Sequence, residues 1–320
     1  MPIDSGFTHT SNNVKLYKHL DNLSLLQKGI VVPIMVHIIP THRCQMNCVF
    51  CCFKNRKNRK RDLPLSKLIS GITNFYNLGT RSVEFTGGGD PTLYPYINEA
   101  LKWIHTRDMN VGFITNTVDS QLVKHWDYCN WVRVSLNTLD YHDDMNIGPI
   151  RDSGTYISAC YIWNEKSTLK GFKKVVEFAR KEKIICRVAP DCIKPSNEIN
   201  ESVEVLKEIF KEYKGDKYIF LSDFNITTGR PNLDCRIHMI KPCFYLDGYV
   251  YSCPSSELAY EHNHCVPTSI RVCRYDEIID FYMGDEALKA IERKCSYCKY
   301  AKQQIVLEEV LTETTFNEFA

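Results

Sequence analysis

Three cysteines near the start of the chain have the spacing of a metal-binding loop. Cys44, Cys48 and Cys51 are separated by three and then two residues, so one tight loop can gather their thiols around a metal. A zinc site would normally add a fourth Cys or His nearby, but Cys52 points away from Cys51 in an extended chain and His42 falls on the strand side. Three thiolates that hold an iron–sulfur cluster, with one iron left open, fit this spacing better.

The composition is that of an ordinary globular protein, except for its cysteines. The 320 residues are 44% hydrophobic and 24% charged, with a net charge of +2, so bulk charge favours neither nucleic acid nor a membrane. There is no run of about eighteen apolar residues and no secretory signal, which predicts a cytoplasmic protein. Fifteen cysteines in a reducing compartment indicate metal or redox chemistry, with about half of them serving as small buried hydrophobic residues.

Strands and helices alternate through most of the chain. The apolar run at residues 31–39 is typical of a buried strand, and the cysteine loop follows it directly. Further strands are predicted at residues 82–85, 110–115, 131–136, 184–189 and 217–221, and helices at residues 63–79, 96–108, 120–126, 169–183 and 201–213. This alternation predicts parallel βα units, here an α/β fold with a partial (β/α)6 TIM-like barrel. Functional residues of such a barrel lie on loops at the carboxyl ends of its strands.

Two segments within the first 222 residues differ from this pattern. A polar helix at residues 13–28 predicts a helical N-terminal extension, residues 1–30, ahead of the barrel at residues 31–222. The connection at residues 138–168 is long enough to form a substrate cap. Its polar side chains, such as Arg151, either meet substrate or form a lid without a chemical role.

After residue 221 the sequence changes character. A turn-rich linker leads to two β-rich runs around Asp247-Gly248, which predict a hairpin with a two-residue turn. A helix at residues 276–293 follows. Residues 223–320 are therefore predicted to form a small C-terminal domain of a hairpin and a helix. This part holds seven cysteines and little apolar mass, so a bound metal would help to hold it together.

The first cysteine motif carries a resemblance to a known family. C-x-x-x-C-x-x-C after the first strand of a βα array resembles the signature of the radical S-adenosylmethionine (SAM) enzymes. In that family the three thiolates bind a [4Fe-4S] cluster, and the amino group and carboxylate of SAM chelate the fourth iron. The residue before the last cysteine is usually aromatic and packs near the adenine, and here it is Phe50. The resemblance implies that Cys44, Cys48 and Cys51 are the cluster ligands.

Three further motifs follow the next three predicted strands. TGGGDP resembles the family's GGE motif, whose backbone meets the SAM amino group, with Asp in place of the usual Glu. ITNT is similar to the family's ITNG, and VSLN resembles its ribose-contact motif. Singly, such residues often only form loops or cap helices, but four motifs at consecutive strand ends favour the family. The SAM-binding residues that the resemblance implies are Gly87, Gly88, Gly89, Asp90, Thr115, Asn116, Ser135 and Asn137.

The C-terminal cysteines carry a second resemblance. C-x12-G-x4-C, followed after a gap by C-x-x-C, resembles the Twitch domain, the shortened form of the SPASM domain of radical SAM enzymes. Such domains carry an auxiliary [4Fe-4S] cluster, which implies Cys235, Cys253, Cys295 and Cys298 as ligands. If the hairpin has a two-residue turn, Cys243 lies almost opposite Cys253 and competes with Cys235. A rubredoxin-like or zinc-ribbon site is the alternative.

Two other features have open interpretations. The segment Phe53–Arg61 holds six basic residues at the mouth of the predicted barrel, either as a solvated loop or as a contact for an anionic substrate. Cys160 and Cys192 either donate a hydrogen atom to a substrate radical or are ordinary thiols.

The resemblance implies an oxygen-sensitive enzyme, an oxidoreductase or isomerase. A reductant such as flavodoxin or ferredoxin would supply an electron, SAM would yield a 5′-deoxyadenosyl radical, and the radical would take a hydrogen atom from substrate. The auxiliary cluster would accept or supply an electron. Only 43 residues precede Cys44, too few for a peptide-recognition domain, so we expect an anionic small-molecule, sugar or nucleotide substrate. A peptide to be epimerised or cross-linked is the runner-up, and a non-catalytic zinc or iron–sulfur module that binds nucleic acid is the alternative of another class.

Overall fold

The computed structural model of the chain describes residues 14–54, 56, 58–222, 235–253, 270–291, 298 and 300–312. The strands are β1 (Val36–Ile39), β2 (Ser82–Phe85), β3 (Asn110–Thr115), β4 (Trp131–Ser135), β5 (Tyr156–Trp163), β6 (Ile185–Pro190), β7 (Ile219–Leu221), β8 (Cys243–Tyr245), β9 (Tyr249–Tyr251) and β10 (Arg271–Arg274). The α-helices are α1 (Leu20–Gln27), α2 (Leu65–Leu78), α3 (Ile97–His105), α4 (Gly148–Asp152), α5 (Leu169–Glu182), α6 (Ser196–Phe210), α7 (Ile278–Met283) and α8 (Ala301–Leu311).

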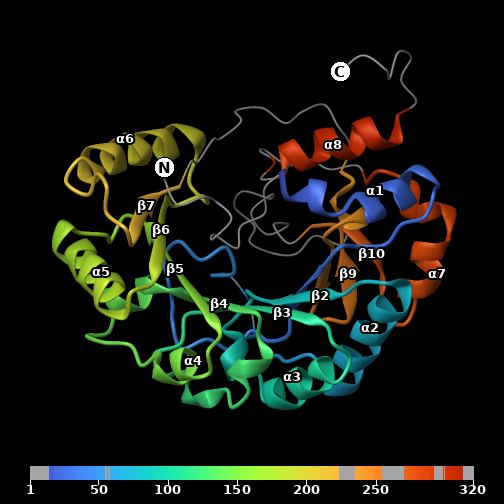
Figure 1. The fold of residues 1–320 in the computed structure, drawn as a ribbon, viewed down its shortest axis with the longest axis horizontal. Helices are drawn as coiled ribbons and strands as arrows, with labels where there is room; N and C mark the ends of the chain where they lie inside the picture. The colour runs from blue at the N-terminus through green and yellow to red at the C-terminus, as the bar shows by residue number, and fades with distance from the viewer. Residues whose placement is uncertain are drawn as a thin grey trace.

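All of these strands belong to one open, curved sheet. Its order is β10-β9-β8-β1-β2-β3-β4-β5-β6-β7, and every neighbouring pair from β8 to β7 is parallel. Figure 1 shows helices α2 to α6 along the outer side of the curve. A parallel sheet that is covered by helices and does not close confirms the predicted α/β partial barrel.

The register of the strands separates an apolar outer face from a more polar concave face. A Cβ on Gly71 of α2 would lie 2.4 Å from the Phe244 ring, so Phe244 on β8 faces the helices. Residues paired with it across the sheet share that face and are buried, namely Ile38, Phe85, Phe113 and Val132. Because side chains alternate along a strand, Arg133 and Ser135 lie on the concave face, where each is half-buried.

Local signals explain where the outer helices begin and end. α2 ends at Gly79, which takes the left-handed φ of +109° that closes a helix and that other residues rarely adopt. α5 begins at Thr168, whose hydroxyl accepts a hydrogen bond from the Gly171 N–H at 3.0 Å. These ends set the short connections that bring each following strand back to the sheet.

One strand was missed by the sequence analysis. Residues 138–168 do not form a single cap, because β5 lies within them and pairs with both β4 and β6. A 3-10 helix, η5 (Leu136–Asp140), and the short α4 complete the connection. The run YISACYIW is rich in β-branched and aromatic residues, which is the signal that identifies it as a strand.

The C-terminal hairpin extends the same sheet, and its predicted register was wrong. Cys243 pairs with Tyr251, and the Gly248 N–H donates to the Tyr245 carbonyl at 3.0 Å. The turn is therefore a three-residue loop in which Gly248 supplies a φ of +89°. Strand β8 then pairs with β1 through His37, next to the cysteine loop.

The other predicted helices differ in detail. The helix expected at residues 276–293 is α7 followed by a 3-10 helix, Asp285–Leu288, because Gly284 interrupts it in an extended conformation. The helix expected at 120–126 is two 3-10 turns, Ser120–Leu122 and Trp126–Tyr128. Within the part of the chain that is described, no helix combines the length and apolar character needed to span a bilayer.

Candidate functional site

The cysteine loop lies directly after β1 and gathers three thiols. Cys44, Cys48 and Cys51 are each half-buried, and the Cys51 N–H donates to the Cys48 carbonyl at 3.2 Å. Burial, followed by the neighbouring Cys51 and Cys44, raises the pKa of Cys48 to about 12. Burial also raises the pKa of Cys51. As thiolates, these groups would repel one another and would need a positive partner such as a metal cluster. Among the described residues, no three Cys, His, Asp or Glu side chains are grouped so as to hold a single metal ion.

Hydrogen-bond donors surround the thiols. The Asn116 side-chain amide donates to Cys44 Sγ at 3.3 Å, and the Met46 N–H approaches the same sulfur at 3.4 Å. Arg56 Nη1 lies 3.7 Å from Cys51 Sγ and opposes the burial that raises its pKa. Donors and a cation around sulfur stabilise cluster thiolates, so this donor set fits a [4Fe-4S] cluster held by three cysteines.

Two arginines of the basic run fold back onto the cysteine loop. Arg56 donates from Nη1 to the Phe53 carbonyl at 2.8 Å and from Nε to the His42 carbonyl at 3.1 Å. Arg59 donates to the Cys44 carbonyl at 3.3 Å and to the Met46 carbonyl. These two side chains hold the loop in shape, a role that the sequence analysis did not assign to the basic run.

The glycine loop after β2 packs tightly against the backbone of the cysteine loop. A Cβ on Gly89 would lie 2.0 Å from the Arg43 carbonyl oxygen, and the Asp90 N–H donates to that oxygen at 2.6 Å. Gly88 has a φ of +78°, and a Cβ there would lie 2.9 Å from the Thr41 carbonyl oxygen. Only glycine allows this approach, which fixes where the thiols stand relative to β2. Gly87 lies next to the Phe53 ring.

Asp90 joins three of the strand-end loops. Its buried carboxylate accepts hydrogen bonds from Thr115 Oγ1 at 2.8 Å, the Thr92 N–H at 3.1 Å and Gln45 Nε2 at 3.2 Å. Burial raises the pKa of Asp90, and these donors oppose the rise. The carboxylate therefore connects the cysteine loop to β3 and caps the 3-10 turn after β2.

The loops after β3 and β4 continue this network. The Asn116 carbonyl accepts from Gln45 Nε2 at 3.3 Å and from Thr138 Oγ1 at 2.8 Å. Asn137 is buried, and its amide binds the Ile162 backbone and Asp140, so it positions η5 against β5. Ser135 ends β4, half-buried, and its hydroxyl does not cap η5.

Asp140, the last residue of η5, and Tyr141, which follows it, lie near the thiols. After burial, Cys51 and Cys44, the charge of Asp140 contributes to the raised pKa of Cys48. Burial and then the charge of Cys48 raise the pKa of Tyr141. Burial raises the pKa of Asp140 itself. Neither residue was predicted from the sequence, although Asp140 and Tyr141 follow the VSLN motif by three and four positions.

The hairpin contacts the other side of the cysteine loop. Tyr245 Oη lies 2.7 Å from His42 Nε2, and the Tyr245 ring stacks on Phe53 at a centroid distance of 6.5 Å. Burial lowers the pKa of His42 to about 4, so this imidazole is neutral at pH 7. Phe50, the expected adenine contact, is half-buried within the loop.

Cys160 and Cys192 lie together at one place on the barrel. Cys160 on β5 pairs with Arg187 on β6, and both thiols act electrostatically on the Arg187 guanidinium. Cys192 follows β6 by two residues. The structure therefore brings the two candidate hydrogen donors to the same arginine.

The C-terminal cysteines are only partly described. Cys235 forms a two-way backbone bridge with Ile291, with N–H···O distances of 3.1 Å and 2.9 Å. Cys243 is buried in β8, and Cys253 is buried just after β9. Cys298 is half-buried, and Cys295 lies outside the described residues.

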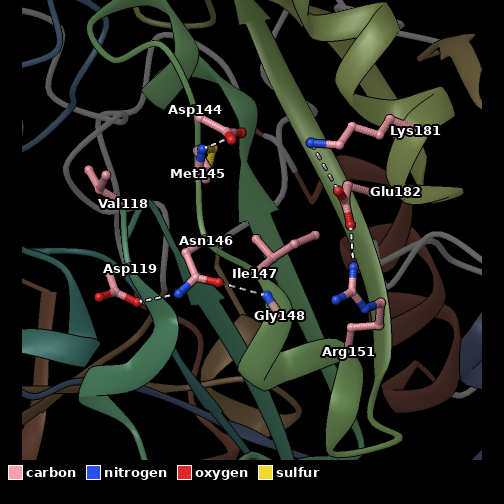
Figure 2. Close-up of a pocket in the computed structure, with 10 residues that line it drawn as sticks. All are labelled: Val118, Asp119, Asp144, Met145, Asn146, Ile147, Gly148, Arg151, Lys181 and Glu182. Atoms are coloured by element: carbon pink, nitrogen blue, oxygen red, sulfur yellow. Dashed lines mark hydrogen bonds and ion pairs between the residues drawn. The ribbon is translucent and has the colours of Figure 1, made fainter.

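A separate pocket lies on another part of the barrel. Figure 2 shows this pocket of about 670 Å³ between the loop after β3, residues 144–151 and the end of α5. Arg151 pairs with Glu182 at 2.8 Å and Asp119 accepts from Asn146 at 2.9 Å, so these lining groups satisfy one another. None of its described lining residues belongs to the predicted cluster and SAM site, and Arg151 is paired with Glu182 of α5.

Comparison with known families gives a match to part of the chain. Residues 38–187 match the family model of the radical SAM superfamily. This segment runs from β1 to β6 and contains the cysteine loop and the strand-end network around it. The chain therefore matches the radical SAM superfamily of enzymes over just under half of its 320 residues.

Three similar curated proteins are each named S-adenosylmethionine-dependent nucleotide dehydratase. The Flammeovirga pacifica protein is 26% identical over 113 residues, 33% of this chain and 39% of the relative. The Lacinutrix mariniflava protein is 27% identical over 113 residues, 33% of this chain and 24% of the relative. The protein of a Thermoplasmatales archaeon is 18% identical over 192 residues, 54% of this chain and 68% of the relative. The matched part thus spans well under half of the first two relatives.

Solved structures share the fold over most of the chain. Streptococcus suis SuiB bound to S-adenosylmethionine superposes with a TM-score of 0.54 and 15% identity, covering 87% of this chain and 73% of SuiB. Native anSMEcpe with bound AdoMet and Cp18Cys peptide gives a TM-score of 0.55 and 12% identity, covering 85% and 88%. At such low identity the likeness shows the fold.

Proposed function

We propose that the chain reductively cleaves SAM and abstracts a hydrogen atom from an anionic, nucleotide-type small molecule. The observation that carries this proposal is the cradle of three thiols, surrounded by N–H donors and Arg56. The names of the curated relatives support a nucleotide as the substrate class. A reductant of the flavodoxin or ferredoxin type would supply the electron.

The chain's own residues would have distinct tasks in this reaction. Cys44, Cys48 and Cys51 would hold the cluster, and three ligands leave one iron for SAM. The bound cluster and SAM together supply the 5′-deoxyadenosyl radical chemistry. Arg56 would offset the negative charge of the thiolates, and Asp90 would keep the surrounding loops aligned. Phe50, Gly87–Gly89, Thr115 and Ser135 remain predicted SAM contacts.

An anaerobic cleavage assay tests this proposal. The protein is reconstituted with iron and sulfide, reduced with dithionite and given SAM, and 5′-deoxyadenosine is measured. We expect product from the native chain and none from Cys48→Ala. Cys52→Ala is the matched control, because it removes a neighbouring thiol outside the motif spacing. Absence of product from the native chain, or equal product from Cys48→Ala, overturns the proposal and favours a non-catalytic metal-binding module.

The substrate class is tested by product analysis of the same reaction. Nucleoside triphosphates and short peptides are supplied in parallel, and consumption is followed by mass spectrometry. We expect a nucleotide to be changed in step with 5′-deoxyadenosine formation. Modification of a peptide alone would assign the chain to the peptide-modifying radical SAM enzymes instead.

We further propose an auxiliary [4Fe-4S] cluster with Cys235, Cys253, Cys295 and Cys298 as ligands. The bridge between Cys235 and Ile291 supports Cys235 over Cys243, because the chain reaches Cys295 and Cys298 directly after Ile291. We expect Cys235→Ala to halve the iron content and Cys243→Ala to leave it unchanged. The opposite result would make Cys243 the ligand, and no loss from either variant would remove the second cluster.

A further inference from the structure

Two arginines face the interior of the barrel from strands that are two apart. Ser135 on β4 pairs with Cys160 on β5, which pairs with Arg187 on β6, so these three share the concave face. Arg133 lies two residues before Ser135 and shares that face as well, next to Ser158 on β5. Neighbouring strands are about 4.8 Å apart, so Arg187 lies roughly 10 Å across the sheet from the end of β4.

The charge of Arg187 is not balanced within the described part of the chain. Its Nε is buried and has no hydrogen-bond partner there, and no carboxylate forms an ion pair with it. Burial, followed by the charge of Arg133, lowers the pKa of Arg187. Arg187 as a whole is half-buried, but a buried Nε–H without an acceptor costs free energy, and a bound anion would supply that acceptor.

The concave face around Arg187 carries further hydrogen-bond donors. Ser158 is buried, and its Oγ also lacks a partner among the described residues. Arg133 has its guanidinium 5.7 Å from the centre of the Trp131 ring, which orients it without neutralising it. Among the acids, Glu84 of β2 is paired with His37 at 3.4 Å, and Asp191, the residue after β6, is buried and accepts from the Ile193 N–H at 3.1 Å, while its Oδ2 has no hydrogen-bond partner among the described residues.

We propose that Arg187, Arg133 and Ser158 bind phosphate oxygens of the nucleotide substrate on the concave face of the barrel. Guanidinium groups bind phosphate through paired hydrogen bonds, and a serine hydroxyl adds a third donor. This assignment rests on the proposed function and names the group of the substrate that the barrel recognises. It also places Cys160 and Cys192 beside the bound phosphate, since both act on Arg187.

Binding of inorganic triphosphate to the reconstituted protein tests the site. Calorimetric titration is done on the native chain and on Arg187→Gln, Arg187→Lys and Ser158→Ala. We expect Arg187→Gln to weaken binding about 10- to 100-fold, because a charge-assisted hydrogen-bond pair is lost. Arg187→Lys should recover part of the affinity. Arg151→Gln is the matched control and should bind as the native chain does, because Glu182 already occupies Arg151.

Two further measurements separate this site from other roles of Arg187. Thermal unfolding without ligand should show Arg187→Gln to be at least as stable as the native chain, because a buried Nε–H that lacks an acceptor is removed. Lower stability of Arg187→Gln, or unchanged triphosphate binding, overturns the proposal. SAM affinity should be unchanged, and a loss of SAM affinity alone would assign the arginines to the SAM carboxylate. Because triphosphate binding needs no SAM cleavage, its failure is distinguishable from failure of the cleavage assay.

Discussion

Gly89 marks the closest approach between the glycine loop and the cysteine loop. Its missing Cβ would lie 2.0 Å from the Arg43 carbonyl oxygen, so Gly89→Ala must push the loops apart. We expect the variant to hold its cluster roughly 10- to 100-fold less tightly, as for losses of supporting contacts around other metal sites. Iron release to a chelator after anaerobic reconstitution measures this.

Gly154→Ala is the control for that experiment. Gly154 also has a positive φ, but a Cβ there would meet no atom within 4 Å. We expect it to cost about 1 kcal/mol of unfolding free energy and to leave iron retention unchanged. Equal iron retention in both variants would show that the contact with Arg43 does not position the thiols.

At the level of single residues, spacing predicted three thiols as cluster ligands, which stays a prediction, but it did not predict the side chains that contact their loop. Cys44, Cys48 and Cys51 are close in sequence, so one loop must gather them. Arg56 and Arg59 reach the loop only because the chain doubles back after it, which a run of basic residues does not reveal. In the same way, the motif predicted that Asp90 lies at the site, but its link to Thr115 depends on the fold.

Among the elements, the hairpin is the one whose role changed most. Its three-residue turn places Tyr245 opposite Tyr249 and beside the cysteine loop, where its hydroxyl meets His42 at 2.7 Å. The dipeptide Asp247-Gly248 suggested a two-residue turn because both turns need a glycine with positive φ. Strand β5 was missed for a different reason, because its residues do not alternate strictly between apolar and polar.

Tyr245→Phe should weaken the contact between this hairpin and the cysteine loop. The change leaves the buried Nε2 of His42 without its hydroxyl partner, which we expect to cost about 1–3 kcal/mol in unfolding free energy. Denaturant unfolding measures the cost. Tyr249→Phe on the next strand is the control, because Arg271 contacts the Tyr249 ring rather than its hydroxyl. Equal stability of the two variants would contradict this role for Tyr245.

On the scale of the whole molecule, the barrel strands other than β5 were predictable from sequence, and the pairing of β8 with β1 was not. A largely apolar run such as residues 110–115 predicts a buried strand, whichever strands it then pairs with. The pairing of β8 with β1 joins segments about 200 residues apart, and nothing local in either segment specifies its partner.

A buried histidine makes the stability of the whole fold depend on pH. His238 lies under α7 and the 3-10 turn after it, and its Nε2 is 3.0 Å from the Ala287 carbonyl oxygen. The Tyr282 hydroxyl donates to the backbone carbonyl of His238, and Arg236 is the nearby charge. Burial lowers the pKa of His238 to about 4, from 6.5 in the unfolded chain. The unfolded chain therefore binds the proton first, and stability falls as the pH drops from about 6.5 to about 4.

His238→Gln should remove this part of the pH dependence. The shift corresponds to a loss of about 3 kcal/mol across that pH range in the native chain. The amide of Gln keeps a donor for the Ala287 carbonyl and does not titrate. Urea unfolding at a series of pH values measures both proteins, and parallel curves would show that His238 is not responsible.

The pairing of β8 with β1 also has a consequence for biosynthesis. The loop that gathers Cys44, Cys48 and Cys51 leaves the ribosome early, but its hydrogen-bond partner Tyr245 follows about 200 residues later. Until β8 is synthesised, the edge of β1 that pairs with it is unpaired, and the cysteine loop lacks its contact with Tyr245. We therefore expect iron and sulfide to be inserted after synthesis of the hairpin, by delivery to a nearly complete chain and not to a nascent one.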